Sequence, residues 1–161
     1  MKRITWLMIG MSVFGCLAGC SKKQEPPKTA QACDLVTPQE FQAVFGAAAK
    51  VNTAAATPEK CCADAQGASV CVWLSRGIAG TSARDKSQLH VVEMVGKYPG
   101  QPILPVGVAG LGDTAGWVEN VGELFVFKGN VLLRVTVNPP DRATLEQVKT
   151  LAEKAVPRLP N

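Results

Sequence analysis

The sequence lacks several features that would assign it directly to a functional class. Histidine occurs once, aromatic residues make up 6% of the chain, and no basic run is longer than a pair such as Lys22-Lys23. No internal repeat is present, and the cysteines do not show the C-x-x-C spacing typical of zinc sites. Nucleic-acid-binding proteins usually carry a basic stripe or patch. The scattered charge therefore argues against a nucleic-acid partner.

Long apolar runs are also absent beyond the first twenty residues. The N-terminal run follows Lys2 and Arg3 and ends in small residues before Cys20, which is the order of an export signal. From Ile4 to Cys20 it spans 17 residues, whereas a membrane-spanning helix needs roughly 20. We therefore expect residues 1–19 to be a signal peptide, whose removal lowers the net charge from +4 to +2.

The end of this run, Leu17-Ala18-Gly19-Cys20, closely resembles the lipobox of bacterial lipoproteins. The resemblance implies that Cys20 receives a diacylglycerol, that the chain is cut just before it, and that the new amino group is acylated, with palmitate as the expected acyl group. Two acyl chains or more hold a protein on a bilayer, where one alone is marginal. An ordinary signal or an anchor helix with a chance cysteine is the alternative.

Residues 20–31 are then the lipidated cysteine and a flexible tether, because this segment is polar and contains Pro26-Pro27. The lipoprotein resemblance implies that the protein lies in the cell envelope, bound to a membrane through its lipid anchor. Ser21, directly after the cysteine, favours the periplasmic side of the outer membrane if the organism has two membranes.

Residues 32–161 are about 130 in number, enough for one hydrophobic core and too few for two, and they predict a single domain. An even number of cysteines in a small domain outside the cytosol indicates disulfides. The candidates are Cys33, Cys61, Cys62 and Cys71, and the sequence does not choose among their three connectivities. A metal site and a thiol-redox role for the Cys61-Cys62 pair are the alternatives.

Two helices are predicted. Thr37 and Glu40 have the spacing of a capping box with Pro38 at the first helical position, which predicts a short helix over 38–45. Near the C-terminus, Asp141 is the expected N-cap of an amphipathic helix over 142–156.

The remaining segments favour strands. Composition and apolar alternation predict a short strand near 49–54, a loop at 58–67, and strands at 69–75 and 88–95. Residues 123–137 predict a hairpin with a three-residue loop at 128–130, which places Arg134 and Thr136 toward solvent. The expected fold is α+β: a mostly antiparallel sheet, stapled by disulfides, with a short N-terminal helix and a C-terminal amphipathic helix packed on one face.

The order of several motifs adds a second resemblance. "ACDLVTPQEFQAVFG" begins the domain, "CVW" follows at 71–73 and "GLGDTAGW" at 110–117, before the hairpin and the last helix. This series resembles small secreted proteins and lipoproteins of unknown function best known from actinobacteria. The resemblance implies a bridge between Cys33 and Cys71 and supplies no activity. Cys61-Cys62, Thr114 and Gly116 depart from that pattern.

Few residues are candidates for a catalytic or binding role. The segment around Asp113 and Trp117 predicts a tight glycine-shaped surface turn with the tryptophan packed beside it, and we take these two residues as a possible binding surface. His90 has no apparent serine or cysteine partner. The other aromatic candidates, Trp73 and Tyr98, are expected first of all in the core.

The preferred hypothesis is a non-catalytic binding module of the cell envelope, without cofactor or metal, whose partner is an envelope protein or a small envelope ligand. The alternative of an envelope polymer-processing enzyme needs a pair of carboxylates. The candidates for it are Glu93, Asp113, Glu119 and Glu123, which are expected to be solvated.

Overall fold

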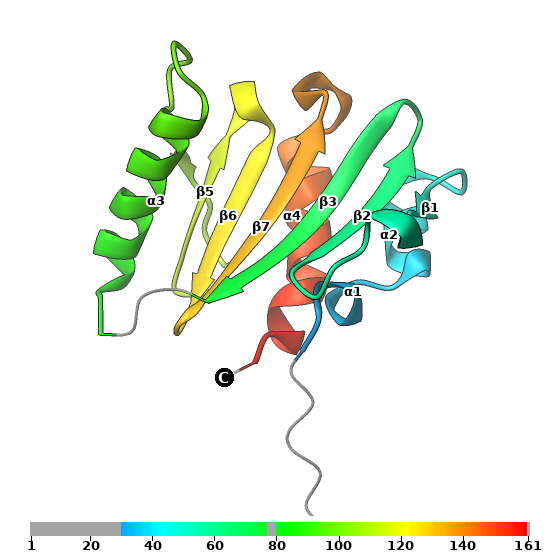
Figure 1. The fold of residues 1–161 in the computed structure, drawn as a ribbon, viewed down its shortest axis with the longest axis horizontal. Helices are drawn as coiled ribbons and strands as arrows, with labels where there is room; N and C mark the ends of the chain where they lie inside the picture. Colours follow the sequence, from blue (N-terminus) through cyan, green and yellow to red (C-terminus); the bar gives the residue numbers. More distant parts are fainter. Residues whose placement is uncertain (1–29, 77–79, 161) are drawn as a thin grey trace, which may run out of the picture.

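The computed structural model describes residues 30–76 and 80–160, in which seven strands form one antiparallel sheet with helices on both faces (Figure 1). The strand order is β1-β2-β3-β7-β6-β5-β4. The strands are β1 (Lys50–Val51), β2 (Lys60–Ala65), β3 (Ala68–Arg76), β4 (Val106–Gly107), β5 (Thr114–Val118), β6 (Glu123–Lys128) and β7 (Val131–Asn138). The α-helices are α1 (Ala32–Leu35), α2 (Pro38–Phe45), α3 (Ala83–Lys97) and α4 (Leu145–Ala155).

The predicted α+β class with an antiparallel sheet is confirmed. The predicted signal peptide, Cys20 and nearly all of the tether lie outside the described residues.

Helix α2 has the predicted bounds. The side-chain hydroxyl of Thr37 accepts a hydrogen bond from the backbone N–H of Glu40 at 3.2 Å, and the Glu40 carboxylate accepts one from the N–H of Thr37 at 2.8 Å. This reciprocal pair satisfies amide groups that a helix start leaves free. The helix ends at Phe45, and its C-cap is Gly46, whose φ of 92° is readily adopted only by glycine.

Helix α4 begins at Leu145, later than the predicted start at residue 142. Thr144 is its N-cap instead of Asp141: the Thr144 hydroxyl accepts a hydrogen bond from the N–H of Gln147 at 3.3 Å, and Gln147 Oε1 accepts one from the N–H of Thr144 at 3.0 Å. Residues 140–142 form a 3₁₀ turn. The prediction of the helix was right, but it assigned the wrong cap.

Residues 88–95 belong to helix α3, so the predicted strand is wrong. The Ser82 side chain caps the helix by accepting a hydrogen bond from the N–H of Asp85 at 3.2 Å. The residues that α3 buries recur every fourth position: Lys86, His90 and Met94. The apolar residues between them that suggested a strand, Leu89, Val92 and Val95, are exposed. Alternation in the sequence therefore did not reflect alternation in burial.

The turn between β6 and β7 has two residues, Gly129 and Asn130, because Lys128 pairs with Val131. The predicted three-residue loop at 128–130 is therefore wrong, as is the predicted loop at 58–67, most of which forms β2. The shorter turn places Phe125 and Phe127 on the opposite face of the sheet from Val131, Leu133, Val135 and Val137. Both sets are buried, because helices cover both faces at this hairpin.

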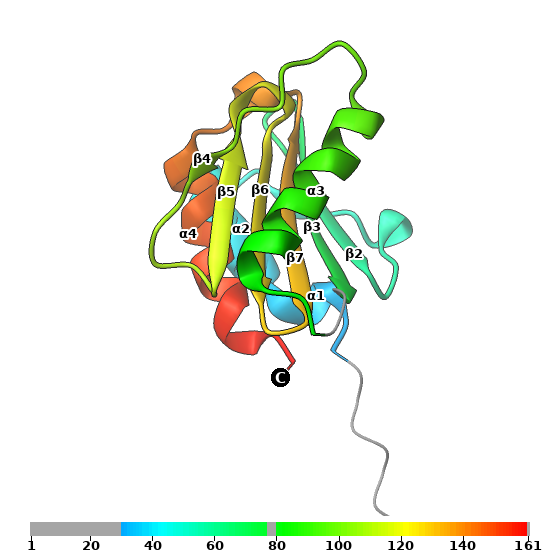
Figure 2. The same ribbon diagram turned by 90° about the vertical axis from the view of Figure 1, so that its left-hand side faces the viewer.

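Helices α1, α2 and α4 cover one face of the sheet, and α3 covers part of the other (Figure 2). The larger core lies beneath α2 and α4, where Phe41 and Leu151 meet the inner residues of β3, β6 and β7. The smaller core lies beneath α3, where Met94 packs with Phe125 and Phe127. Each face of the sheet therefore has its own hydrophobic cluster.

Two disulfides join Cys33 to Cys61 and Cys62 to Cys71. The predicted disulfide stapling is confirmed, but the bridge from Cys33 to Cys71 that the family resemblance implied is wrong. Successive residues of a strand point to opposite faces, so Cys61 and Cys62 on β2 reach different partners and form no vicinal pair. With sequence separations of 28 and 9, the bridges contribute about 3–4 and 2–3 kcal/mol on the loop-entropy model.

Candidate ligand-binding groove

The two residues predicted as a binding surface, Asp113 and Trp117, have separate structural roles. Asp113 is exposed, and its carboxylate accepts a hydrogen bond from the N–H of Gly129 at 2.7 Å, which fastens the glycine turn to the β6–β7 hairpin. Gly112 has a φ of 57°, and a Cβ there would collide with the carbonyl of Phe127. Trp117 is buried in the larger core. The predicted tight turn with a packed tryptophan is thus present, but the two side chains do not form one surface.

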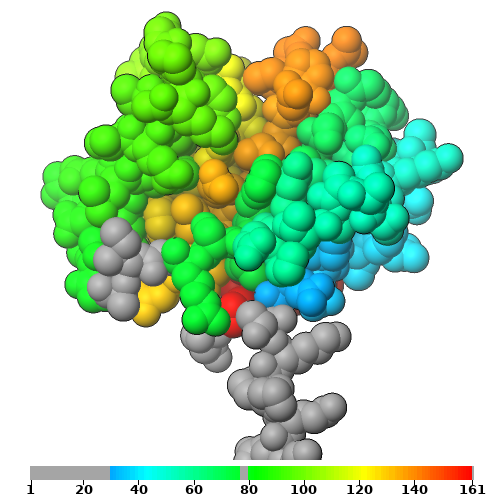
Figure 3. Space-filling model, in the orientation of Figure 1, coloured from blue at the N-terminus to red at the C-terminus, as the bar shows by residue number. Residues whose placement is uncertain are grey.

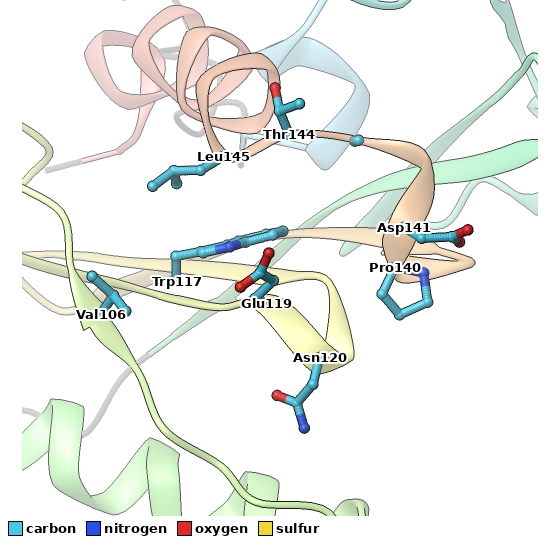
Figure 4. A pocket seen from close by; sticks show the side chains of 9 residues that line it. Val106, Trp117, Glu119, Asn120, Pro140, Asp141, Thr144 and Leu145 are labelled. Carbon is cyan, nitrogen blue, oxygen red and sulfur yellow. The ribbon is translucent and has the colours of Figure 1, made fainter.

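One side of Trp117 lines a cleft of about 750 Å³ between β5 and the start of α4 (Figure 4). Figure 4 shows the Glu119 carboxylate beside the indole and the Asp141 carboxylate turned away from it. The polar groups of Thr144 at the helix start are already bonded to Gln147. The cleft therefore offers no set of polar side chains that converge on a common point.

The four carboxylates considered for catalysis are not brought together. Glu123 is fully buried, contrary to expectation, and its Oε1 lies 2.8 Å from Nε2 of His90. Exposed Glu93 places Oε2 3.5 Å from Nδ1 of the same imidazole. Asp113 lies at the hairpin turn and Glu119 in the cleft. The structure thus sets one histidine between two of the four carboxylates.

An open groove that sequence reasoning missed lies on the face of the sheet that α3 covers only in part. Helix α3 packs against β5 and β6 and covers Leu132 near the start of β7, but it leaves the same face of β3 and of the rest of β7 largely uncovered. Figure 3 shows the resulting hollow between α3 and the β2–β3 strands, with β7 as its floor. Because side chains alternate along strands, Trp73 and Ser75 of β3 and Arg134 and Thr136 of β7 all point into this open groove.

One end of the open groove is a hollow of about 340 Å³ rich in basic side chains. Arg76, Lys86 and Arg134 line it together with Ser75. Phe127 and Leu132 form its apolar base, and His90 and Glu93 border it from α3. A compact polar group could bind there with an apolar part against the base.

The other end is a hollow of about 420 Å³ beside Trp73. Trp73 is half-buried, so the expectation that it belongs to the core holds only in part. Its indole N–H donates a hydrogen bond to the hydroxyl of Thr136 at 3.0 Å. Lys60 Nζ lies 4.7 Å and Arg134 Cζ 5.4 Å from the centroid of the indole ring. These cation–π contacts hold the ring and both cations in the open groove.

The open groove has an excess of positive charge. Five basic residues border it, namely Lys60, Arg76, Lys86, Lys97 and Arg134. Among the described residues, only Lys97 of these five lies within 4.0 Å of a carboxylate, at 3.9 Å from Glu123. Sequence reasoning missed this site because its residues come from strands and a helix that are far apart in the chain.

Over residues 30–76 and 80–160, no cluster of three or more histidine, cysteine, aspartate or glutamate side chains is placed to hold a metal ion. Within the same ranges, no helix combines the length and the apolar character needed to cross a membrane. Comparison with family models, curated proteins and solved structures gave no match. The resemblances to lipoproteins and to the actinobacterial family therefore stay predictions.

Proposed function

We propose that this protein is a lipid-anchored, non-catalytic binding module of the bacterial cell envelope, with the open groove as its binding surface. The observation that carries the proposal is the largely uncovered sheet face, where a half-buried tryptophan lies between two cations that have no carboxylate partner among the described residues. Charged and aromatic side chains fixed in a concavity are typical of ligand sites. The partner is an envelope protein or a small envelope ligand.

The cellular setting rests on the sequence and on the disulfides. Leu17 to Cys20 supply the lipobox, so Cys20 is the acylated anchor and residues 20–31 are the tether. Disulfides persist in oxidising compartments outside the cytosol, and the two bridges of the domain support export. On this proposal the domain lies on the periplasmic side of the outer membrane in an organism with two membranes.

The test is cross-linking in intact cells that express the tagged chain, followed by mass spectrometry of what co-purifies. A Cys20→Ala form should leave the membrane fraction and lose envelope partners. Thr136→Arg places a bulky side chain in the open groove and should lose the partner while the protein remains anchored. Thr150→Arg, on the exposed side of α4, is the matched control and should retain it. A partner captured equally by both threonine variants would show that the open groove is not the binding surface.

An envelope polymer-processing enzyme is the second candidate, because His90 lies between Glu93 and Glu123 beside the open groove. Incubation of the protein with isolated envelope polymer should then release soluble fragments. Glu93→Gln changes only an exposed carboxylate, so it should abolish that release without altering the unfolding temperature. If the native protein releases no fragments, the enzyme candidate is eliminated.

A further inference from the structure

The basic end of the open groove contains a buried positive charge that has no counterion in the described part of the chain. Lys86 is 8% exposed. Its ammonium donates to the carbonyl of Gly129 at 2.7 Å and to Oδ1 of Asn130 at 3.1 Å, both of which are neutral acceptors. No carboxylate of the described residues lies within 4.0 Å of it. A buried charge is costly unless it is paired, so this position favours an anion from outside the chain.

Arg134 adds a second group with unused donors. Its guanidinium stacks on Trp73, and within the described residues its buried Nε has no hydrogen-bond partner. A guanidinium presents its donors as a planar fork that matches a carboxylate or a phosphate. Because Arg134 lies on β7 between two neighbouring strands, the backbone that carries the fork is rigid.

A third cation and a hydroxyl complete the arrangement. Arg76 and Ser75, at the end of β3, line the same hollow as Lys86 and Arg134. Within residues 30–76 and 80–160, Glu93 is the only carboxylate that lines it. Three positive charges therefore face one negative charge in a space of about 340 Å³.

From this juxtaposition, and resting on the open groove as the binding surface, we propose that the ligand is anionic and that its acidic group, a carboxylate or a phosphate, binds between Arg134, Lys86 and Arg76. The Ser75 hydroxyl donates to the same group. The rest of the ligand extends along β7 past Trp73, whose half-buried ring provides a stacking surface.

The test is NMR titration of the exported chain in detergent with inorganic phosphate or with acetate, at constant ionic strength maintained by sodium chloride. The backbone amide of Ser75 and the indole N–H of Trp73 report on the open groove. Saturable shifts of both signals are the expected result. Saturation by phosphate alone identifies a phosphate ligand, and saturation by acetate identifies a carboxylate ligand. Shifts that grow linearly for both anions, as from non-specific screening, would overturn the proposal.

Three variants locate the anion. Arg134→Gln should weaken binding at least about tenfold, because it removes a charge-assisted fork. Arg76→Gln, an exposed position that the fold does not need, should weaken it about threefold. Arg142→Gln, an exposed arginine outside the open groove, is the control and should leave binding unchanged. Equal affinity in all three variants would overturn the assignment.

The two proposals fail in different ways. Loss of the cellular partner in Thr136→Arg, together with unsaturable anion titrations, would retain the open groove as a binding surface and remove the anionic ligand. Retention of the partner in Thr136→Arg would remove the open groove from the function, whichever result the titration gives.

Discussion

The two faces of the sheet differ in what they bury. The face beneath α2 and α4 is covered by a cluster made only of apolar residues. The three buried charged or titratable side chains of the described ranges are Lys86, His90 and Glu123, and all of them lie on the α3 face, beside a smaller apolar cluster and the open groove. Since buried polar groups are costly unless paired, the comparison indicates that one face supplies stability and the other carries polar groups available for function.

The largest expected effect is on the apolar face. Leu151 of α4 is fully buried there, and Leu151→Ala should lower the free energy of unfolding by about 3–5 kcal/mol through lost burial and a cavity that does not collapse. The matched variant on the other face is Met94→Ala in α3, which should cost about 2–3 kcal/mol because the hydrophobic cluster around it is smaller. Urea unfolding with the disulfides intact measures both. A larger cost for Met94→Ala would reverse the comparison.

The next effect concerns the buried hydrogen-bonded pair of His90 and Glu123 beneath α3. His90→Leu leaves the Glu123 carboxylate buried, with Lys97 at 3.9 Å as its one remaining cation among the residues that the structure describes, and should cost about 2–4 kcal/mol. The double variant His90→Leu/Glu123→Met replaces the pair by apolar side chains and should recover most of that loss. Equilibrium unfolding at pH 7 of the native protein, the two single variants and the double variant measures this double-mutant cycle. Additive losses in the double variant would show that the two side chains are not coupled.

A smaller effect is expected at Gly116, where a Cβ would collide with the ring of Phe125. That ring is packed against His90, with a centroid separation of 5.0 Å, and has little room to move. Gly116→Ala should therefore cost about 1–3 kcal/mol. Gly107→Ala, where a Cβ would meet nothing within 4 Å, is the control and should be nearly neutral in thermal unfolding. Equal unfolding temperatures would contradict the predicted collision.

The smallest expected effect comes from an ion pair between Glu40 and Arg158, on the face of the sheet that α2 and α4 cover. The Arg158 guanidinium donates to both carboxylate oxygens of Glu40, at 2.7 and 2.8 Å, and this hydrogen bonding lowers the pKa of Glu40 from 4.5 to about 2. Because the pKa is lower in the folded state, the stabilisation is complete above about pH 4.5 and is lost as pH falls toward 2. With Arg158 40% exposed, its contribution is about 0.5–1 kcal/mol.

Arg158→Gln should remove that contribution at pH 7 and flatten the fall of stability between pH 4.5 and 2, the interval between the two pKa values of Glu40. Lys154→Gln, which removes an exposed cation from α4, is the matched control and should keep the native slope. Thermal unfolding across this pH interval measures both. Identical slopes in the two variants would show that the pair contributes nothing.

Local signals in the sequence predicted the elements that local contacts determine. The predicted bounds of helix α2 were correct to the residue, because Thr37, Pro38 and Glu40 define its start without contacts from the rest of the chain. Helix α3 was misread because its buried positions are Lys86, His90 and Met94, two of which are polar. Their burial depends on partners in β6 and in the hairpin turn, which no local pattern displays.

The candidate site was less accessible to sequence reasoning than the fold. Arg134 and Thr136 were assigned to solvent because one face of the hairpin was expected to be bare. That face of the hairpin is partly open, because Arg134 and Thr136 are only half-buried. It forms a groove, however, because α3 lies on one side of these residues and Trp73 on the other. The convergence of Arg134 with Lys86 and Arg76 follows from strand order and from the placement of α3, neither of which the sequence alone specifies.

The pairing of the cysteines also determines how a mechanical load would travel through the domain. A pull from the proposed anchor at Cys20 enters the described fold near Ala30 and meets Cys33, which is linked covalently to Cys61 on β2. The adjacent Cys62 passes the force to Cys71 on β3, in the middle of the sheet. Helix α2 and β1, which lie between the first two cysteines, are bypassed. Tension between membrane and ligand would therefore act on β2 and β3, the strands along one side of the open groove, and would not peel the domain from its N-terminal end.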